Sequence, residues 1–239
     1  MLAAFVDKIL SLGAIQKTEI GGRIYTKGAM TLVQAPEHSG PGTLKFRTLR
    51  GLADYVFKNA DITCLEDTFL HVHDFNRVLL QGHLIPAACN TRFLYAEAEL
   101  HAKSFGFGVW YDLENFIIAL QSMFVADDAT ESLLGLLRHL ANEHVVENKD
   151  DGFSQGVQIK TGITTKSQVK ITNPMTFRPY RTFRDIEQPP SQFIFRLRKG
   201  DKGLLCVLFE SDGEAWKLDA IAGIKAWLEA QLPEAIVIG

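Results

Sequence analysis

Apolar residues recur at helical spacing in five segments of the chain. The first is a short amphipathic stretch at residues 1–10, with Phe5, Val6, Ile9 and Leu10 on one side. The other four begin near residues that cap helices well, which are Thr48, Asp112, Asp128 and Ser211. Asp128 and Ser211 are each followed three residues later by a glutamate, the spacing of a capping box. The pattern therefore predicts about five helices.

Each predicted helix has an apolar stripe that we expect to face a core. The expected stripes are Leu49, Leu52, Val56 and Phe57; Phe116, Ile117, Leu120 and Phe124; Leu133, Leu137, Leu140, Ala141 and His144; and Trp216, Ile221, Ile224, Trp227 and Leu228.

Short runs rich in apolar and β-branched residues, bounded by turn residues, predict the strands. They cover 20–35 (two strands around Lys27-Gly28), 68–74, 77–85, 91–98, 157–163, 169–172, 192–198 and 204–210. The connection at 74–76 is short enough for a hairpin, so the strands it joins are expected to be antiparallel. Strands and helices come in blocks and do not alternate strictly, which favours an α+β fold with mixed or antiparallel sheets.

The sharpest change in composition is the polar run at 147–152. It divides an N-terminal α+β region, 1–147, from a C-terminal α+β region, 153–239. We expect the two regions to form one compact unit.

The chain has 239 residues, of which 46% are apolar and 22% charged, with a net charge of −3. These values are typical of globular domains and exclude a disordered or collagen-like chain. The longest clean apolar run, 204–209, is far shorter than a membrane span, and residues 1–10 lack the features of a signal peptide. The three cysteines are widely spaced and indicate no disulfide framework, so a cytoplasmic location fits best.

Candidate catalytic and metal-binding residues are few. His71 and His73 alternate along a predicted strand, so both rings share a face, but hairpin pairing places His83 too far away to complete a metal site. Glu97 and Glu99 also share a strand face. Motifs for a nucleophile, a phosphate loop or a zinc protease are absent from the sequence. A non-enzymatic protein without a cofactor is therefore preferred.

The segment 176–202 differs from the rest of the chain because it holds seven basic and three acidic residues. Its basic residues are Arg178, Arg181, Arg184, Arg196, Arg198, Lys199 and Lys202, interleaved with Phe177, Tyr180, Phe183, Phe193 and Phe195. Such a mixture suits single-stranded nucleic acid, where arginine meets phosphate and aromatic rings stack on bases. The alternation at 193–198 equally suits a strand with phenylalanines in the core, and arginine with aromatic residues is also common at subunit interfaces.

Residues 176–198, the run TFRPYRTFRDIEQPPSQFIFRLR, resemble the YfdQ-like family of phage and prophage proteins. Similar passages are FIIALQSMF at 116–124, KTGI at 160–163 and FESDGEAWK at 209–217. The resemblance covers the C-terminal half well and the N-terminal half loosely. It implies a viral or prophage origin and a host cytoplasm, and it carries over no catalytic residue.

Pro174, Pro179, Pro189 and Pro190 predict that 173–190 is a stiff, extended connection and not a central strand. The leading hypothesis is a self-associating phage protein, forming a ring or shell through this arm and the terminal segments. The alternatives are a single-strand-binding or recombination accessory, and a small-molecule binder or enzyme that uses His71 and His73. The residues expected to contact a partner or nucleic acid are Arg178, Tyr180, Arg181, Phe183, Arg184, Arg196 and Arg198.

Overall fold

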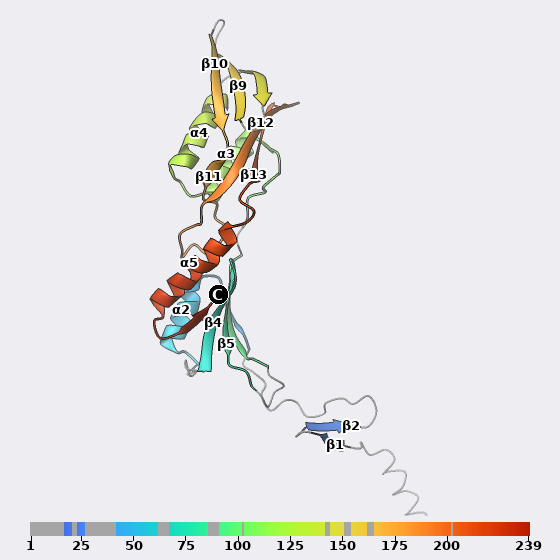
Figure 1. Ribbon diagram of the computed structural model, residues 1–239, viewed down its shortest axis with the longest axis vertical. Coiled ribbons are helices and arrows are strands. Elements are labelled where there is room, and N and C mark those ends of the chain that lie inside the picture. Colours follow the sequence, from blue (N-terminus) through green and yellow to red (C-terminus); the bar gives the residue numbers. More distant parts are fainter. Residues whose placement is uncertain are drawn as a thin grey trace, which may run out of the picture. The chain divides into compact units, whose positions relative to one another are not determined.

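The computed structural model describes most of the chain, and contacts between residues divide it into two compact units (Figure 1). The described residues are 17–20, 23–26, 42–61, 67–85, 91–101, 103–141, 144–150, 154–161, 165–201 and 203–239. The first unit comprises Met1–Gly42 and Leu84–Phe93, and the second comprises Thr43–His83 and Leu94–Gly239.

In the first unit, β1 (Lys17–Ile20) and β2 (Arg23–Thr26) pair antiparallel. Of the two strands predicted around Lys27-Gly28, the first overlaps β2, and the second lies outside the described residues. The helix predicted over 1–10 lies outside the described residues.

The second unit contains a mixed five-stranded sheet with the order β14-β4-β5-β6-β3. Its strands are β3 (Leu44–Phe46), β4 (Thr68–Asp74), β5 (Arg77–Gly82), β6 (Leu94–Glu99) and β14 (Ile236–Ile238). The predicted β4–β5 hairpin is antiparallel, as expected, whereas β14 and β3 join the sheet in parallel.

Two helices, α2 (Leu49–Lys58) and α5 (Trp216–Gln231), pack on the same side of this sheet (Figure 1). Alternate strand residues such as Leu70, Val72 and Val78 point to that side and form a core with the helices. Thr48 caps α2 as predicted, because its hydroxyl accepts a hydrogen bond from the Gly51 amide at 3.1 Å. The prediction that Phe57 faces the core is wrong, since it is 76% exposed.

The last helix begins later than predicted. Residues 211–215 form a turn, and α5 starts at Trp216 with Ala215 at its N-cap and no side-chain cap. Trp216, Ile224 and Leu228 are buried as expected, and Ile221 and Trp227 are partly buried against the same core.

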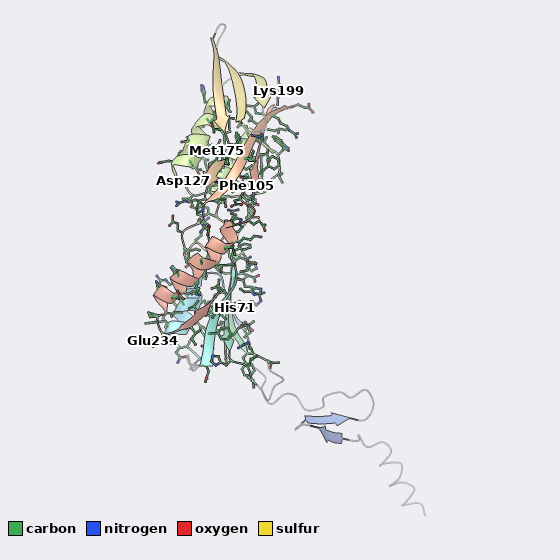
Figure 2. All side chains as sticks on the ribbon, in the orientation of Figure 1. His71, Phe105, Asp127, Met175, Lys199 and Glu234 are labelled. Atoms are coloured by element: carbon green, nitrogen blue, oxygen red, sulfur yellow. The ribbon has the colours of Figure 1, made fainter. Side chains whose placement is uncertain are left out.

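A second core lies between helices α3 (Leu113–Met123) and α4 (Asp128–Ala141) and an antiparallel four-stranded sheet. The sheet order is β11-β12-β13-β7, with β7 (Tyr111–Asp112), β11 (Met175–Phe177), β12 (Ser191–Gly200) and β13 (Gly203–Glu210). The predicted β12–β13 hairpin is confirmed, and Lys199 lies near its tip (Figure 2). Phe116, Phe124, Phe177, Phe193 and Phe195 fill this core.

The cap of α3 is the predicted residue, whereas the cap of α4 is shifted by one residue. Asp112 accepts a hydrogen bond from the Asn115 amide, as predicted, and the contact lowers the pKa of that carboxyl group. The cap of α4 is Asp127 and not Asp128, because the Asp127 carboxylate accepts from the Thr130 amide at 2.9 Å. His144 does not extend the stripe of α4, since it already belongs to β8.

A third sheet, with the order β10-β9-β8, is antiparallel. Its strands are β8 (His144–Asp150), β9 (Ser154–Thr161) and β10 (Thr165–Thr172). The composition break at 147–152 therefore lies inside the second unit and includes the last four residues of β8.

The fold is α+β, as the sequence predicted. The described part of the chain contains four helices, and none of them has the length and hydrophobicity needed to cross a membrane.

On the face of the five-stranded sheet opposite its helices, a buried carboxylate lies between two cations. Glu97 is 3% exposed, and its side chain pairs with Arg77 and, at 2.9 Å, with Lys45. The hydrogen bonds from Arg77 and then Lys45 lower the pKa of Glu97. Glu99, on the same strand face, lies beside His101 at the end of the strand.

We expect Glu97→Gln to lower the free energy of unfolding by about 1–3 kcal/mol at neutral pH, because it removes charge-assisted hydrogen bonds. A lowered folded-state pKa stabilises the fold above the ordinary value of 4.5, and this contribution is lost as the pH falls through the lowered value. The difference between the two proteins should therefore vanish in acid. Urea unfolding at several pH values measures this difference, with the half-buried Glu99→Gln as the control. Equal stability at pH 7 would contradict the assignment.

Candidate binding site around Arg181

The segment 173–190 runs between the two cores of the second unit and is held by residues of its own chain. Phe177 belongs to the core under α3 and α4, and Phe183 belongs to the core under α2 and α5. The Tyr180 amide donates to the Met123 carbonyl at 2.8 Å, and the Thr182 hydroxyl donates to the Phe75 carbonyl. Residues 175–177 of the segment form β11 at the edge of its sheet, and residues 178–190 contain no helix or extended strand, so the prediction that 173–190 is not a central strand is confirmed.

Asp185 fixes this segment to α2. Its two carboxylate oxygens accept hydrogen bonds from the amides of Leu49 and Arg50, each at 3.2 Å. A carboxylate at a helix N-terminus satisfies unpaired amides and complements the helix dipole. The loop and the helix are therefore joined although 135 residues separate Arg50 from Asp185 in sequence.

Arg181 is the buried centre of the segment. Its guanidinium donates hydrogen bonds to the Glu210 carboxylate and the Ser191 hydroxyl. The guanidinium carbon lies 3.8 Å from the centre of the Trp216 ring and 5.6 Å from that of Phe107. Burial lowers the pKa of Arg181 to about 10, so the group remains charged at neutral pH.

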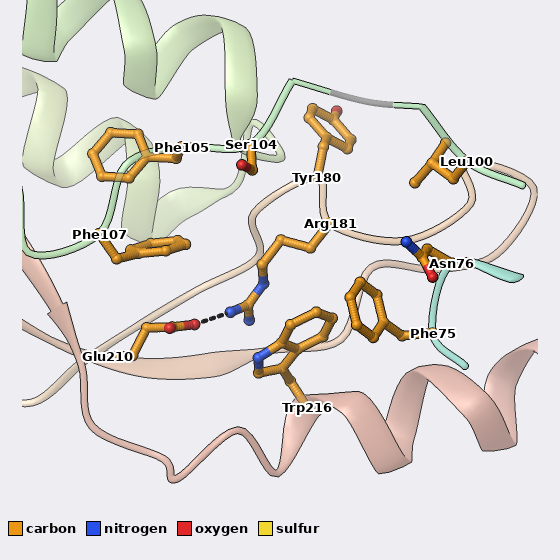
Figure 3. A pocket seen from close by; sticks show the side chains of 10 residues that line it. All are labelled: Phe75, Asn76, Leu100, Ser104, Phe105, Phe107, Tyr180, Arg181, Glu210 and Trp216. Atoms are coloured by element: carbon orange, nitrogen blue, oxygen red, sulfur yellow. Dashed lines mark hydrogen bonds and ion pairs between the residues drawn. The ribbon is translucent and has the colours of Figure 1, made fainter. Parts of the chain in front are cut away.

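A cavity of about 330 Å³ opens beside this guanidinium (Figure 3). Its lining residues are Phe75, Asn76, Leu100, Ser104, Phe105, Phe107, Tyr180, Arg181, Glu210 and Trp216. Trp216 is 5% exposed, and its indole nitrogen has no hydrogen-bond partner among the described residues. Most buried polar groups in proteins are paired, so this unpaired donor on a residue of the cavity wall is an unsatisfied polar group of the site.

An adjoining pocket of about 240 Å³ shares Leu100 and Tyr180 with this cavity and is more basic. Its other lining residues are Arg47, Thr48, His101, Thr182, Arg184 and Asp185. Arg47 and Arg184 are exposed, and the Arg184 guanidinium lies over the Tyr180 ring at 3.9 Å. Asp185 is the acidic residue of this wall, and its carboxylate is engaged by α2.

The structure distributes the predicted contact residues over three environments. Arg181 and Phe183 are buried by residues of their own chain, so neither side chain is available to a partner in this fold. Tyr180 and Arg184 line the pockets described above, and Arg178 pairs with Glu187. Arg196 and Arg198 lie on β12, where Arg198 stacks over the Trp110 ring at 4.0 Å.

Sequence reasoning did not identify three residues of these pockets as site residues. Trp216 was expected only as a core residue, and Glu210 only as the end of a strand. Arg47 precedes a helix cap and belongs to no motif. A tryptophan beside an acidic turn is a weak signal, and nothing in the sequence links it to Arg181.

The histidines and cysteines considered as metal ligands or nucleophiles form no comparable site among the described residues. The rings of His71 and His73 lie on one face with centres 5.5 Å apart, but no cluster of three metal ligands occurs among the residues that the structure describes. Cys206 is buried, and burial raises the pKa of its thiol to about 12, so it is a thiol at neutral pH. Cys64 and Cys89 lie outside the described residues.

No protein-family model, curated protein or solved structure matches this chain. The resemblance to the YfdQ-like family therefore stays a prediction.

We expect Arg181→Met to lower the free energy of unfolding by about 3 kcal/mol, since it leaves one member of a buried charge pair without its partner. Arg181→Lys should lose most of the same stability, because an ammonium group lacks the planar fork that reaches Glu210 and Ser191 while stacking on Trp216. Urea unfolding monitored by circular dichroism gives the values.

The matched control is Arg198→Met, which removes an exposed arginine from another tryptophan ring. It should cost less than about 1 kcal/mol. If Arg181→Met were as stable as the parent protein, the buried guanidinium would not hold the two cores together.

Proposed function

We propose that this protein binds single-stranded nucleic acid at the two adjoining pockets around Tyr180. The observation that carries the proposal is the basic pocket in which Arg47 and Arg184 are exposed beside an aromatic ring. Exposed arginines suit phosphate, and a neighbouring aromatic cavity suits an unstacked base. The binding is local, since the whole chain has a net charge of −3.

The aromatic contacts in this proposal differ from those expected from sequence. Phe177, Phe183, Phe193 and Phe195 are fully buried and cannot stack on bases. Tyr180 is partly exposed and connects the basic pocket with the cavity of Arg181. The proposed surface is therefore the middle of segment 173–190, residues 180–185, together with the chain that precedes α2.

The test replaces Arg47 and Arg184 by glutamate and measures binding of a short fluorescent single strand by anisotropy. We expect the double variant to bind at least tenfold more weakly than the parent protein, because two phosphate contacts become repulsive. The dependence of log K on log salt should also become shallower, by about 0.7 for each phosphate that the protein no longer neutralises.

Lys199→Glu is the control, since it makes the same basic-to-acidic replacement at one position near the tip of the β12–β13 hairpin, and Lys199 lines neither pocket. It should leave the affinity within about twofold of the parent value. Absence of salt-sensitive binding by the parent protein would contradict the proposal.

Self-association is a second candidate function, and a different surface supports it. The strand β14 lies at the edge of its sheet, where Ile236 and Ile238 are 52% and 44% exposed and Val237 is buried. Antiparallel pairing of two β14 strands about Val237 would place Ile236 of each copy opposite Ile238 of the other. Such self-complementarity favours a dimer in which the two copies join through their sheet edges. Self-association of this kind fits the leading hypothesis from the sequence, a self-associating phage protein.

Replacing Ile236 and Ile238 together by lysine should keep the protein monomeric, because like charges would then face one another across the paired edges. Sedimentation velocity over a micromolar concentration series should show association of the parent protein and none of the variant. Phe57→Lys, which changes the very exposed residue on α2, is the control and should associate like the parent. A parent protein that stays monomeric throughout would rule this candidate out.

A further inference from the structure

We infer that the cavity beside Arg181 takes a single nucleobase, read at its edge by Trp216 and Glu210. This inference rests on the proposed binding of single strands and assigns the base and the phosphate to separate pockets. It starts from the polar groups that the fold leaves unsatisfied on the cavity wall.

Trp216 supplies a hydrogen-bond donor. Its indole nitrogen is buried without a partner among the described residues, and its ring is fixed between the Arg181 guanidinium and the Phe75 ring. Because the ring is held by these contacts, the donor keeps one direction. In Figure 3 the nitrogen is on the edge of the ring turned toward Glu210.

Glu210 supplies an acceptor. One of its carboxylate oxygens receives the hydrogen bond from Arg181, and the other accepts none from the described residues. Its side chain is 30% exposed, so a ligand entering from solvent can reach it. The wall therefore contains a donor on Trp216 and an acceptor on Glu210 that a ligand with a complementary edge would satisfy together.

Charge decides which part of a nucleotide enters the cavity. The positive charge of Arg181 is compensated by Glu210, and the other lining residues, Phe75, Phe107 and Tyr180 among them, are neutral. The cavity consequently favours a neutral, flat group with a donor and an acceptor on one edge, which is the description of a nucleobase. The adjoining pocket has Arg47 and Arg184 for the anionic phosphate.

Size is consistent with this assignment. A cavity of about 330 Å³ lies at the lower end of the range for small-ligand sites, so it fits one ring system and not a folded nucleic acid. Tyr180, which borders both pockets, would then lie where the sugar connects the base to its phosphate.

The experiment compares a short single strand with an abasic strand of equal length, in which every base is absent and all phosphates remain. The parent protein should bind the complete strand about tenfold more tightly than the abasic one. Trp216→Phe, which retains an aromatic ring but removes the donor, should reduce this ratio to about twofold or less. Glu210→Gln should reduce it in the same way while retaining a similar shape.

Trp227→Phe is the matched control, since Trp227 lines neither pocket, and it should leave the ratio unchanged. Thermal unfolding of each variant shows that it is folded before binding is measured. As a second readout, nitrogen-15 NMR follows the indole signals of the three tryptophans. The signal missing in Trp216→Phe should shift with the complete strand and remain in place with the abasic strand.

Equal affinity of the parent protein for the two strands would overturn the nucleobase inference and leave the proposed function standing, because phosphate contacts alone would explain the binding. A tenfold ratio that Trp216→Phe and Glu210→Gln both leave unchanged would overturn the assignment of the cavity. Failure of both strands to bind would overturn the proposed function together with this inference.

Discussion

The buried guanidinium of Arg181 is the group on which the arrangement of the second unit depends. It reaches Phe107 and Phe193 of one core, Trp216 at the start of α5, and Glu210 at the end of β13. A charge in such an environment is tolerated only when its hydrogen bonds are satisfied, and Glu210 and Ser191 satisfy them. The same contacts hold the ring of Trp216 and form one wall of the cavity.

Segment 173–190 makes this arrangement possible because it contacts both cores in a few residues. Phe177 and Phe183 anchor it on either side, and Asp185 caps α2. The prolines limit the conformations of the segment before folding, which reduces the entropy lost when it is ordered. Segment 173–190, which the sequence suggests as an arm that contacts another molecule, is in this fold an internal connection. Its accessible part includes Tyr180 and Arg184.

The position of the candidate site follows from this connection. It lies where chain from the sheet end at Phe75, the segment after β6, the helix α5 and segment 173–190 meet. Sites formed at such junctions combine residues distant in sequence, so side chains that serve the fold also line the cavity. Arg181 and Trp216 have both roles, and Leu100 and Tyr180 line the basic pocket as well as this cavity.

The sequence by itself determined the α+β class, the caps at Thr48 and Asp112, and both long hairpins, because these depend on local periodicity and on turn residues close in sequence. Tertiary structure alone decided that Phe57 is exposed and that β14 pairs in parallel with β4. Tertiary structure also decided that the Arg181 side chain is buried. A run of interleaved arginines and aromatic residues has the same sequence pattern whether its charges pair with another molecule or with a distant residue of the same chain. The pairing of Arg181 with Glu210 spans 29 residues, and no local pattern encodes a contact at that separation.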